Sequence, residues 1–405
     1  MAYTVLARRY RSTTFDELVG QEPVARTLRS AIAAGRVAHA YLFTGTRGVG
    51  KTSMARLFAR ALNAPDTIPD CPKLPGREGD YPPADVQDRM AQAIMRGDDL
   101  NVIEIDGASN NSVDNARSLI AGASLSPTAG ALFKVYIIDE VHMLSTAAFN
   151  ALLKTMEEPP SHVKFILCTT ESHKVPATIQ SRCQRFDFRN IPSARIAEHL
   201  RSVLDREQIE ADDALVWQVA RLGNGSMRDA LSLLDRVIAT DQRPLTQQTL
   251  VEMLGLPPQQ RVVDLIDAIA RGDLKASLEH TAGLIDSGIA QDQVLDVLTE
   301  RFRQIMLIAA CGPDSGLVEM SDEEKQAAAE QATHFDPQSL VYMIALCESA
   351  QRTTRASSNA RALLDATIVR MALAEKLADV AALLSGDGAA RPAAGSAEKK
   401  KLTRS

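Results

Sequence analysis

Long apolar runs are missing from this 405-residue sequence, in which no stretch reaches the roughly 18 residues that a membrane-spanning helix needs. Residues 1–10 contain no apolar segment followed by a cleavage site, so no secretory signal is predicted. A strong excess of one charge is missing too, because 45 basic and 51 acidic side chains leave a net charge of −6. A mildly acidic chain is not expected to coat nucleic acid nonspecifically. We predict a cytoplasmic protein that does not enter a membrane.

Cysteine is scarce as well. The five cysteines are odd in number and widely spaced, and no C-x-x-C pair occurs. This pattern favours reduced thiols over a disulfide framework. With 45% hydrophobic and 24% charged residues, the remaining composition is that of an ordinary globular protein. At about 150 residues per domain, the length predicts two or three domains.

Strand and helix patterns alternate in the first part of the chain. Short apolar runs predict strands at 40–44, 101–105, 133–138 and 163–168, with helical stretches between them. Continuous apolar strands separated by helices are typical of a parallel sheet covered on both faces. Six prolines within residues 64–83 predict an irregular insertion, because proline fixes φ and disfavours helix in the residue before it.

Strand signals end near residue 193, and only helical periodicity follows. We predict a sheet domain over 1–180, a small all-α unit over 181–243 and a larger helical domain over 244–384. Residues 385–405 are rich in Gly, Ala, Pro and Ser, a composition that predicts a disordered tail. The predicted fold class is therefore α/β followed by all-α.

A glycine-rich motif after the first predicted strand indicates a phosphate site. It matches G-x-x-x-x-G-K-[ST] and opens a predicted helix, which argues against a chance match by a glycine-rich turn. The glycines let backbone N–H groups surround phosphates at the positive end of the helix. Lys51 would neutralise the β- and γ-phosphates, and the Thr52 hydroxyl would ligate Mg²⁺. The motif comprises Gly45, Thr46, Arg47, Gly48, Val49, Gly50, Lys51 and Thr52.

Two carboxylates, Asp139 and Glu140, close the third predicted strand. Asp139 could hold Mg²⁺ from the side opposite Thr52, and Glu140 could orient and deprotonate an attacking water. An acidic pair at a strand end is common, so the pair alone indicates little. Together with the phosphate motif it predicts hydrolysis, because binding without hydrolysis needs only the glycine-rich motif.

Several single residues have two readings from spacing alone. Arg182, in a Ser-Arg-Cys sequence, is either a surface arginine or one that reaches a γ-phosphate and stabilises charge in the transition state. Arg228 follows Ser226, a predicted helix cap, and is either part of a plain helix start or a functional residue fixed in the first turn. Arg117 is either a solvated side chain or a nucleic-acid contact. His142 gives a D-E-x-H sequence without other helicase motifs, so packing or hydrogen bonding is predicted for it.

Longer segments together resemble the gamma/tau subunit family of bacterial DNA polymerase III, the ATPase subunits of the sliding-clamp loader. The similarity extends from about residue 3 to about residue 380. The segments that carry it are 5–11, 15–21, 39–52, 103–109, 133–144, 149–160, 181–183 and 225–235.

The resemblance implies an AAA+ P-loop sheet domain, a helical lid and a C-terminal helical collar. It also implies a pentameric ring in which this chain assembles with further copies of itself and with delta and delta-prime subunits, and which acts on the sliding clamp and primer–template DNA. By the same resemblance, Arg182 acts in trans on the ATP of a neighbouring subunit, and Arg228 senses the γ-phosphate from the lid. Thr169 or Thr170 would be the sensor at the strand end.

Further contacts are implied by the resemblance alone. Residues near the adenine would be Val19 and Gln21, with Arg8 and Arg11 from the N-terminal segment. After the second strand, Asn110, Ser112 and Arg117 would approach template DNA, although the family's basic residues are replaced here by Asn110 and Ser112.

The sequence departs from the family at two places. Relatives usually carry four zinc-binding cysteines in the insertion, whereas here only Cys71 remains and no histidine is present. Because a structural zinc site needs about four such ligands, we predict no zinc. Tau-type relatives also continue into segments that bind the polymerase and the helicase, so this sequence is expected to be gamma-like or a truncated form.

The predicted function is ATP-driven loading of the sliding clamp onto primed DNA, with ATP and Mg²⁺ as ligands and no polymerase active site in this chain. One alternative is another AAA+ DNA-processing ATPase, such as a branch-migration or recombination motor, which would need DNA-binding motifs of its own. The other is a scaffold subunit that binds nucleotide without turnover. The presence of Lys51, Thr52, Asp139 and Glu140 argues against the scaffold.

Overall fold

The computed structural model describes residues 4–385, apart from 129, 241–242, 256–258, 314, 316, 319, 321, 355–356 and 358. The chain separates into two compact units, Met1–Thr249 and Leu250–Ser405. Beyond Ser385, the tail predicted to be disordered lies outside the described residues.

The first unit is built on a five-stranded sheet whose strand order is β2-β3-β4-β1-β5, with every pairing parallel. Three of the four predicted strands are apolar enough to be almost fully buried, and all four form within one residue of their predicted start. The strands are β1 (Ala40–Thr44), β2 (Val102–Asp106), β3 (Lys134–Asp139), β4 (Val163–Thr169) and β5 (Gln184–Asp187).

The fifth strand was not predicted from the sequence. It pairs with β1 along the open edge and lies in the range expected for the small helical unit, so the sheet extends past residue 180. Only Phe186 of its four residues is buried, because the strand is a short edge strand. A single apolar residue among polar ones carries too little pattern to be recognised as a strand.

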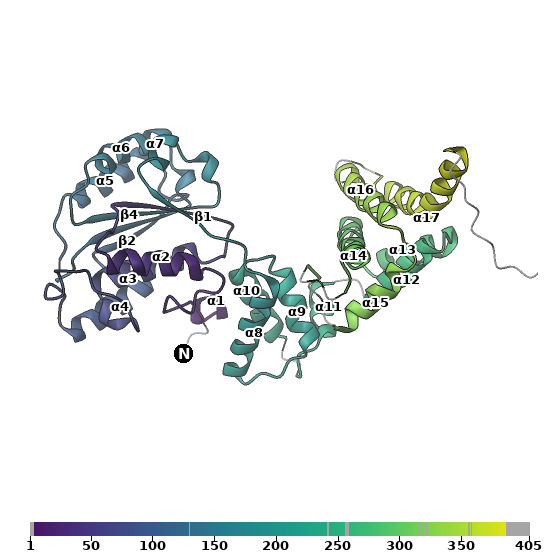
Figure 1. Cartoon of the computed structure of the whole chain (residues 1–405), viewed down its shortest axis with the longest axis horizontal. Coiled ribbons are helices and arrows are strands. Elements are labelled where there is room, and N and C mark those ends of the chain that lie inside the picture. The colour runs from purple at the N-terminus through teal and green to yellow at the C-terminus, as the bar shows by residue number, and fades with distance from the viewer. Residues whose placement is uncertain are drawn as a thin grey trace, which may run out of the picture. The chain divides into compact units, whose positions relative to one another are not determined.

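Helices cover both faces of the sheet, as the apolar strands require. Figure 1 shows α2, α3 and α4 on one face of the sheet and α5, α6 and α7 on the other. Alternate strand residues point to opposite faces, so Phe43 and Ile166 pack in the core on the α3 face, whereas Leu42 and Phe165 pack in the core on the α6 face. These helices are α2 (Glu22–Ala33), α3 (Lys51–Asn63), α4 (Ala84–Arg96), α5 (Val113–Ala123), α6 (Thr146–Glu157) and α7 (Ala177–Gln180), and α1 (Leu6–Arg9) precedes them.

The proline-rich insertion is held to the sheet domain by packing and polar contacts. Ile68 and Leu74 are buried in the same core as α3. Lys73 and Asp66 form an ion pair of 2.8 Å, and the Tyr81 hydroxyl accepts a hydrogen bond from the backbone N–H of Leu74. These contacts fix a segment whose only regular element is a 3₁₀ turn at Pro65–Thr67. Among the described residues no cluster of three or more His, Cys, Asp or Glu side chains could hold a metal ion, and the absence of zinc stays a prediction.

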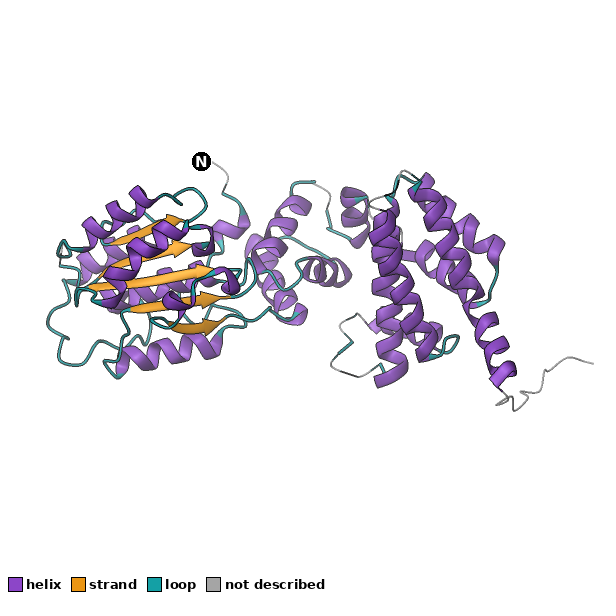
Figure 2. Cartoon of the chain, turned by 90° about the horizontal axis from the view of Figure 1, so that it is seen from above, coloured by secondary structure: helices purple, strands orange, loops and turns teal. Residues whose placement is uncertain are grey.

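The remaining elements are helical, which confirms the predicted order of α/β followed by all-α (Figure 2). The second unit has a separate core around Leu295, Phe302 and Leu340. No described helix combines the length and apolar character of a membrane span. The helices are α8 (Ser193–Glu207), α9 (Asp213–Leu222), α10 (Met227–Ile238), α11 (Gln247–Leu254), α12 (Gln259–Ala270), α13 (Leu274–Asp286), α14 (Gln291–Cys311), α15 (Asp322–Ala332), α16 (Pro337–Thr354) and α17 (Ala360–Ser385).

Candidate nucleotide-binding site

The register of the sheet brings the polar strand ends to one edge. Thr44 of β1 lies opposite Thr169 of β4, and Asp106 of β2 lies opposite Asp139 of β3. In open parallel sheets, ligands bind at the carboxyl edge, where helices begin. The glycine-rich loop and the acidic pair therefore meet although they are far apart in the sequence.

Glycine is required in the loop between β1 and α3 by both backbone angle and space. Gly45, Gly48 and Gly50 have φ values of 147°, 77° and 103°, which side-chain-bearing residues rarely adopt. A Cβ atom on Gly48 would lie 1.9 Å from the Oγ atom of Ser226, at the start of α10. Because the glycines carry no side chains, the backbone N–H groups of the loop are accessible to phosphates. The loop also packs closely against the start of α10.

Lys51 is the first residue of α3 and is buried. Its ammonium group donates hydrogen bonds of 2.8 Å to the carbonyl oxygens of Gly45 and Thr46. Burial lowers the pKa of this ammonium group, and the nearby carboxylates of Asp139 and Glu140 partly offset that effect. A positive charge held mainly by neutral carbonyls stays available for an anion that enters the loop.

Thr52 and Asp139 form a donor set for a divalent cation. The Thr52 hydroxyl donates a hydrogen bond of 2.7 Å to one carboxylate oxygen of Asp139. The other carboxylate oxygen accepts a hydrogen bond of 3.0 Å from the backbone N–H of Glu140. Two hard oxygen ligands at this spacing fit Mg²⁺, which is usually bound by one or two protein ligands together with substrate phosphates.

Glu140 adopts a left-handed backbone conformation, with φ of 45°. Its carboxylate accepts hydrogen bonds from the hydroxyl and the backbone N–H of Thr170, at 3.1 and 3.3 Å. Thr169 instead contacts His142, whose Nδ1 atom lies 3.0 Å from the Thr169 hydroxyl and 3.4 Å from the Glu140 carboxylate. Of the two candidate sensor residues, Thr170 is therefore the one in direct contact with Glu140, while His142 lies between Thr169 and Glu140.

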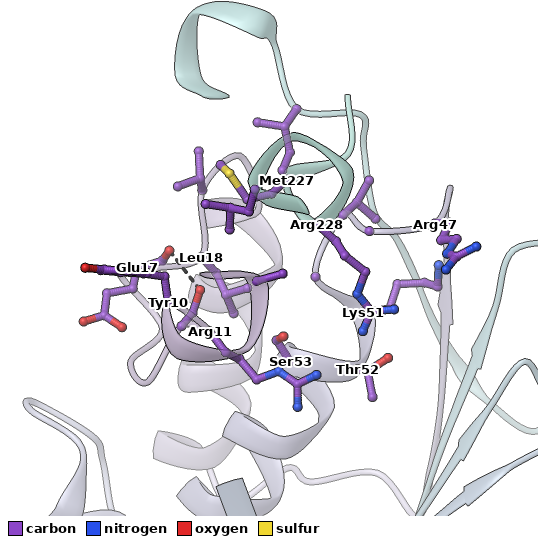
Figure 3. A pocket seen from close by; sticks show the side chains of 18 of the residues that line it. Tyr10, Arg11, Glu17, Leu18, Arg47, Lys51, Thr52, Ser53, Met227 and Arg228 are labelled. Carbon is purple, nitrogen blue, oxygen red and sulfur yellow. Dashed lines mark hydrogen bonds between the residues drawn. The ribbon is translucent and has the colours of Figure 1, made fainter. Parts of the chain in front are cut away.

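A pocket opens above these groups and is lined by four cationic side chains. Arg11, Arg47 and Arg228 join Lys51 around it, and Figure 3 places the guanidinium group of Arg11 beside Ser53 and directs Arg228 toward Lys51. Within the described part of the chain, none of the three arginine side chains forms an ion pair or a hydrogen bond. Desolvation and the repulsion of other arginines lower the pKa of Arg11. The pocket therefore carries excess positive charge suited to a polyanion.

Other predicted site residues lie around this pocket but do not line it. Gln21 is buried and binds the backbone of Arg189 through both its amide atoms, at 2.8 and 3.3 Å. Thr46 bonds to Asn190 at 2.6 Å, and Arg8 is exposed on α1. The predicted residues that do line the pocket are Arg11, Val19, Arg47, Gly48, Val49, Gly50, Lys51, Thr52, Asp139, Glu140 and Arg228.

Two groups of predicted residues lie elsewhere on the sheet domain. Arg182 is not among the residues that line the pocket and forms an ion pair with Glu157. Asn110 and Ser112 lie in the loop between β2 and α5, and Arg117, on α5, pairs with Asp114 at 3.3 Å. The proposed DNA contacts are therefore grouped near the N-terminus of α5, and their role stays a prediction.

The sequence did not predict several residues that line the pocket. Most of them come from the N-terminal segment, α8 and α10, whereas Ser53 belongs to α3 and Ile191 to the segment between β5 and α8. On an ordinary amphipathic helix, the spacing of such residues predicts burial and not a binding site. Met227 differs only in that it adjoins Arg228, which was predicted as a site residue. They are Ala7, Tyr10, Ser12, Glu17, Leu18, Ser53, Ile191, His199, Met227 and Leu231.

Family comparisons assign each segment of the chain to the same replication machinery. Residues 20–192 match the model described as DNA polymerase III, delta subunit. Residues 195–242 match the ATPase lid domain of a DNA polymerase III clamp loader subunit. Residues 245–386 match domain III of DNA polymerase III subunits gamma and tau.

A solved structure also overlaps loosely with the chain. The Holliday junction branch migration motor RuvB of Thermotoga maritima has a TM-score of 0.43 and 20% identity, covering 64% of this chain and 79% of that one. A superposition this loose supports no functional comparison.

Curated relatives agree over most of the chain. DNA polymerase III subunit tau/gamma of Haemophilus influenzae is 36% identical over 91% of this chain and 51% of its own length. Subunit tau of Escherichia coli is 39% identical over 80% of this chain, and the match covers 49% of that protein, so the chain spans about half of these relatives. Subunit gamma of Buchnera aphidicola is 38% identical, with 73% of this chain and 78% of that protein covered. With its parallel sheet, glycine-rich loop and lid, the chain belongs to the gamma/tau subunit family of bacterial DNA polymerase III.

Proposed function

We propose that this chain is the ATPase motor of a clamp loader, which places the sliding clamp on primed DNA in the bacterial cytoplasm. The observation that carries the proposal is the cluster of Lys51, Arg11, Arg47 and Arg228 beside the Thr52–Asp139 pair. Cations that form no ion pair among the described residues, placed around a helix N-terminus, fit the triphosphate of ATP. Membership of the gamma/tau family supports the same activity.

The residues of the loop would bind the triphosphate without large rearrangement. Backbone N–H groups of the glycine-rich loop and of the first turn of α3 would surround the phosphates, and Lys51 would exchange its carbonyl contacts for phosphate oxygens. Thr52 and Asp139 would hold Mg²⁺, which neutralises charge on the β- and γ-phosphate oxygens.

Hydrolysis needs a group that removes a proton from the attacking water. Glu140 is the candidate, because it lines the pocket beside Asp139. Its contact with Thr170 holds the carboxylate by one of its oxygens and leaves the other free of hydrogen bonds among the described residues. Thr170 would thereby orient the base, and Arg228 would report the γ-phosphate to α10, whose N-terminus contacts Gly48.

Arg182 would complete the site of a neighbouring subunit. The side chain does not line the pocket of its own chain, so it cannot contribute there as placed. In a pentameric ring of this chain with delta and delta-prime subunits, such an arginine would reach the γ-phosphate bound next door and stabilise charge in the transition state. Turnover would then depend on assembly, on the clamp and on primer–template DNA.

The test is ATP turnover by the assembled complex with and without clamp and primed DNA. We expect strong stimulation by both together. Lys51→Ala should abolish nucleotide binding, whereas Glu140→Gln should keep binding and lower turnover by about 10²-fold or more. Turnover indifferent to clamp and DNA would instead indicate a different AAA+ ATPase, and binding without any turnover would indicate a scaffold subunit.

A further inference from the structure

Arg182 is presented at the surface by a short, well-anchored turn. It follows α7, and its neighbours Ile179 and Cys183 pack against the core on the α6 face of the sheet. Burial raises the pKa of the Cys183 thiol to about 12, in keeping with its apolar surroundings. The backbone at Arg182 is therefore fixed, and only the side chain is free to change its contacts.

Three contacts hold the guanidinium group of Arg182 within its own chain, and the longest of them runs from its Nη1 atom to the Ser181 hydroxyl oxygen at 3.5 Å. Its Nη2 atom donates to a carboxylate oxygen of Glu157, the last residue of α6, at 2.6 Å. Its Nη1 atom donates to the carbonyl oxygen of Thr178 at 2.7 Å. Both side chains of the ion pair stay partly exposed, at 33% for Arg182 and 50% for Glu157.

A carboxylate and a phosphate are the same kind of partner for a guanidinium group, because both offer anionic oxygens to its planar N–H donors. Glu157 therefore occupies a donor that a γ-phosphate would take, and its negative charge opposes the approach of another anion. Since a solvent-exposed ion pair contributes little stability, an incoming phosphate can replace it readily.

We propose that Glu157 is a positioning residue that holds Arg182 in its own subunit until the γ-phosphate bound by a neighbour displaces it. This inference rests on the proposed function, in which Arg182 acts in trans. Because one anionic partner replaces another, the guanidinium group of Arg182 is never left without an anionic partner. It also restrains hydrolysis in loosely seated subunits, because a phosphate that is too distant cannot compete with Glu157.

The test compares Glu157→Gln with Glu158→Gln in the full-length chain, assembled into the loader. Glu158 is the adjacent residue, carries the same charge, is exposed and has no ion pair among the described residues, so its variant is a matched control. Glu157→Gln should raise turnover without clamp and DNA by about two- to fivefold and lower the stimulation ratio. Glu158→Gln should behave as wild type. ATP affinity of the isolated chain should be unchanged in both, because Arg182 serves another subunit's site.

The double variant Glu157→Gln, Arg182→Ala distinguishes the role of Glu157 from the proposed action of Arg182 in trans. Its turnover should equal that of Arg182→Ala, because Glu157 acts through Arg182. Activation that persists in the double variant, or a Glu157→Gln turnover equal to or below that of Glu158→Gln, would overturn the role of Glu157 alone. Normal turnover in Arg182→Ala itself would overturn the action in trans, and with it the inference.

Discussion

Gly48 lies where the glycine-rich loop packs against the start of α10. Its φ of 77° and the 1.9 Å approach of a built Cβ to Ser226 both exclude a side chain. Gly48→Ala should therefore weaken binding of an ATP analogue by about tenfold or more and lower the free energy of unfolding by about 1–3 kcal/mol. Calorimetric titration and urea unfolding measure the two effects.

Gly283 in α13 gives the matched control for this change. Nothing lies within 4 Å of a Cβ built there, so Gly283→Ala should leave binding unchanged and stabilise the helix slightly. Wild-type affinity in Gly48→Ala would contradict the close packing of lid and loop.

The pH dependence of cysteine alkylation gives a second test at the residue scale. Burial raises the pKa of Cys71 to about 11 and those of Cys183 and Cys347 to about 12. At pH 8 these thiols are protonated and should alkylate slowly, whereas Cys311 is exposed and should react first. Reactivity of the buried thiols should rise only toward their raised pKa values or on unfolding. Mass spectrometry of the labelled native protein measures the order, and early labelling of Cys347 would contradict the packing.

At the scale of elements, the N-terminus of α10 contacts the glycine-rich loop at Gly48. The Ser226 hydroxyl accepts a hydrogen bond of 3.2 Å from the backbone N–H of Asp229, which is the cap predicted from the sequence. Ser226→Ala should cost about 1 kcal/mol of stability and weaken ATP binding a few-fold, because Arg228 lies in the turn that the cap holds. Ser232→Ala, in the exposed middle of α10, should change the urea midpoint much less.

The elements also mark the limit of prediction from sequence. Strand β3 was predicted because its residues are apolar on both faces, whereas β5 was not, because only Phe186 among its residues packs inward. The loop glycines, Lys51 and Asp139 were found because phosphate chemistry demands those residue types at fixed spacing. The placement of Tyr10 and His199 over the loop follows from tertiary packing, which leaves no local pattern in the sequence.

At the scale of the whole molecule, the two units have separate hydrophobic cores. Calorimetry should resolve two unfolding transitions, one for each unit. ATP with Mg²⁺, at an ATP concentration of a hundred times Kd, should raise the free energy of unfolding of unit Met1–Thr249 alone, by about 2.7 kcal/mol. Leu298→Ala, a buried change in α14, should lower the other transition by about 2–5 kcal/mol without altering ATP binding. A single transition raised as a whole by ATP would contradict this independence.

The proposed action of Arg182 in trans is the main claim at this scale, and mixing two defective chains tests it most directly. Lys51→Ala removes the triphosphate site but keeps Arg182, and Arg182→Ala does the reverse. Each variant alone, assembled with its loader partners, should turn over ATP about 10²-fold or more below wild type. Mixed within one assembly, they should recover turnover well above either, because Arg182 of one chain then meets ATP bound by the other. Turnover in the mixture no higher than the average of the two separate assemblies would contradict the account.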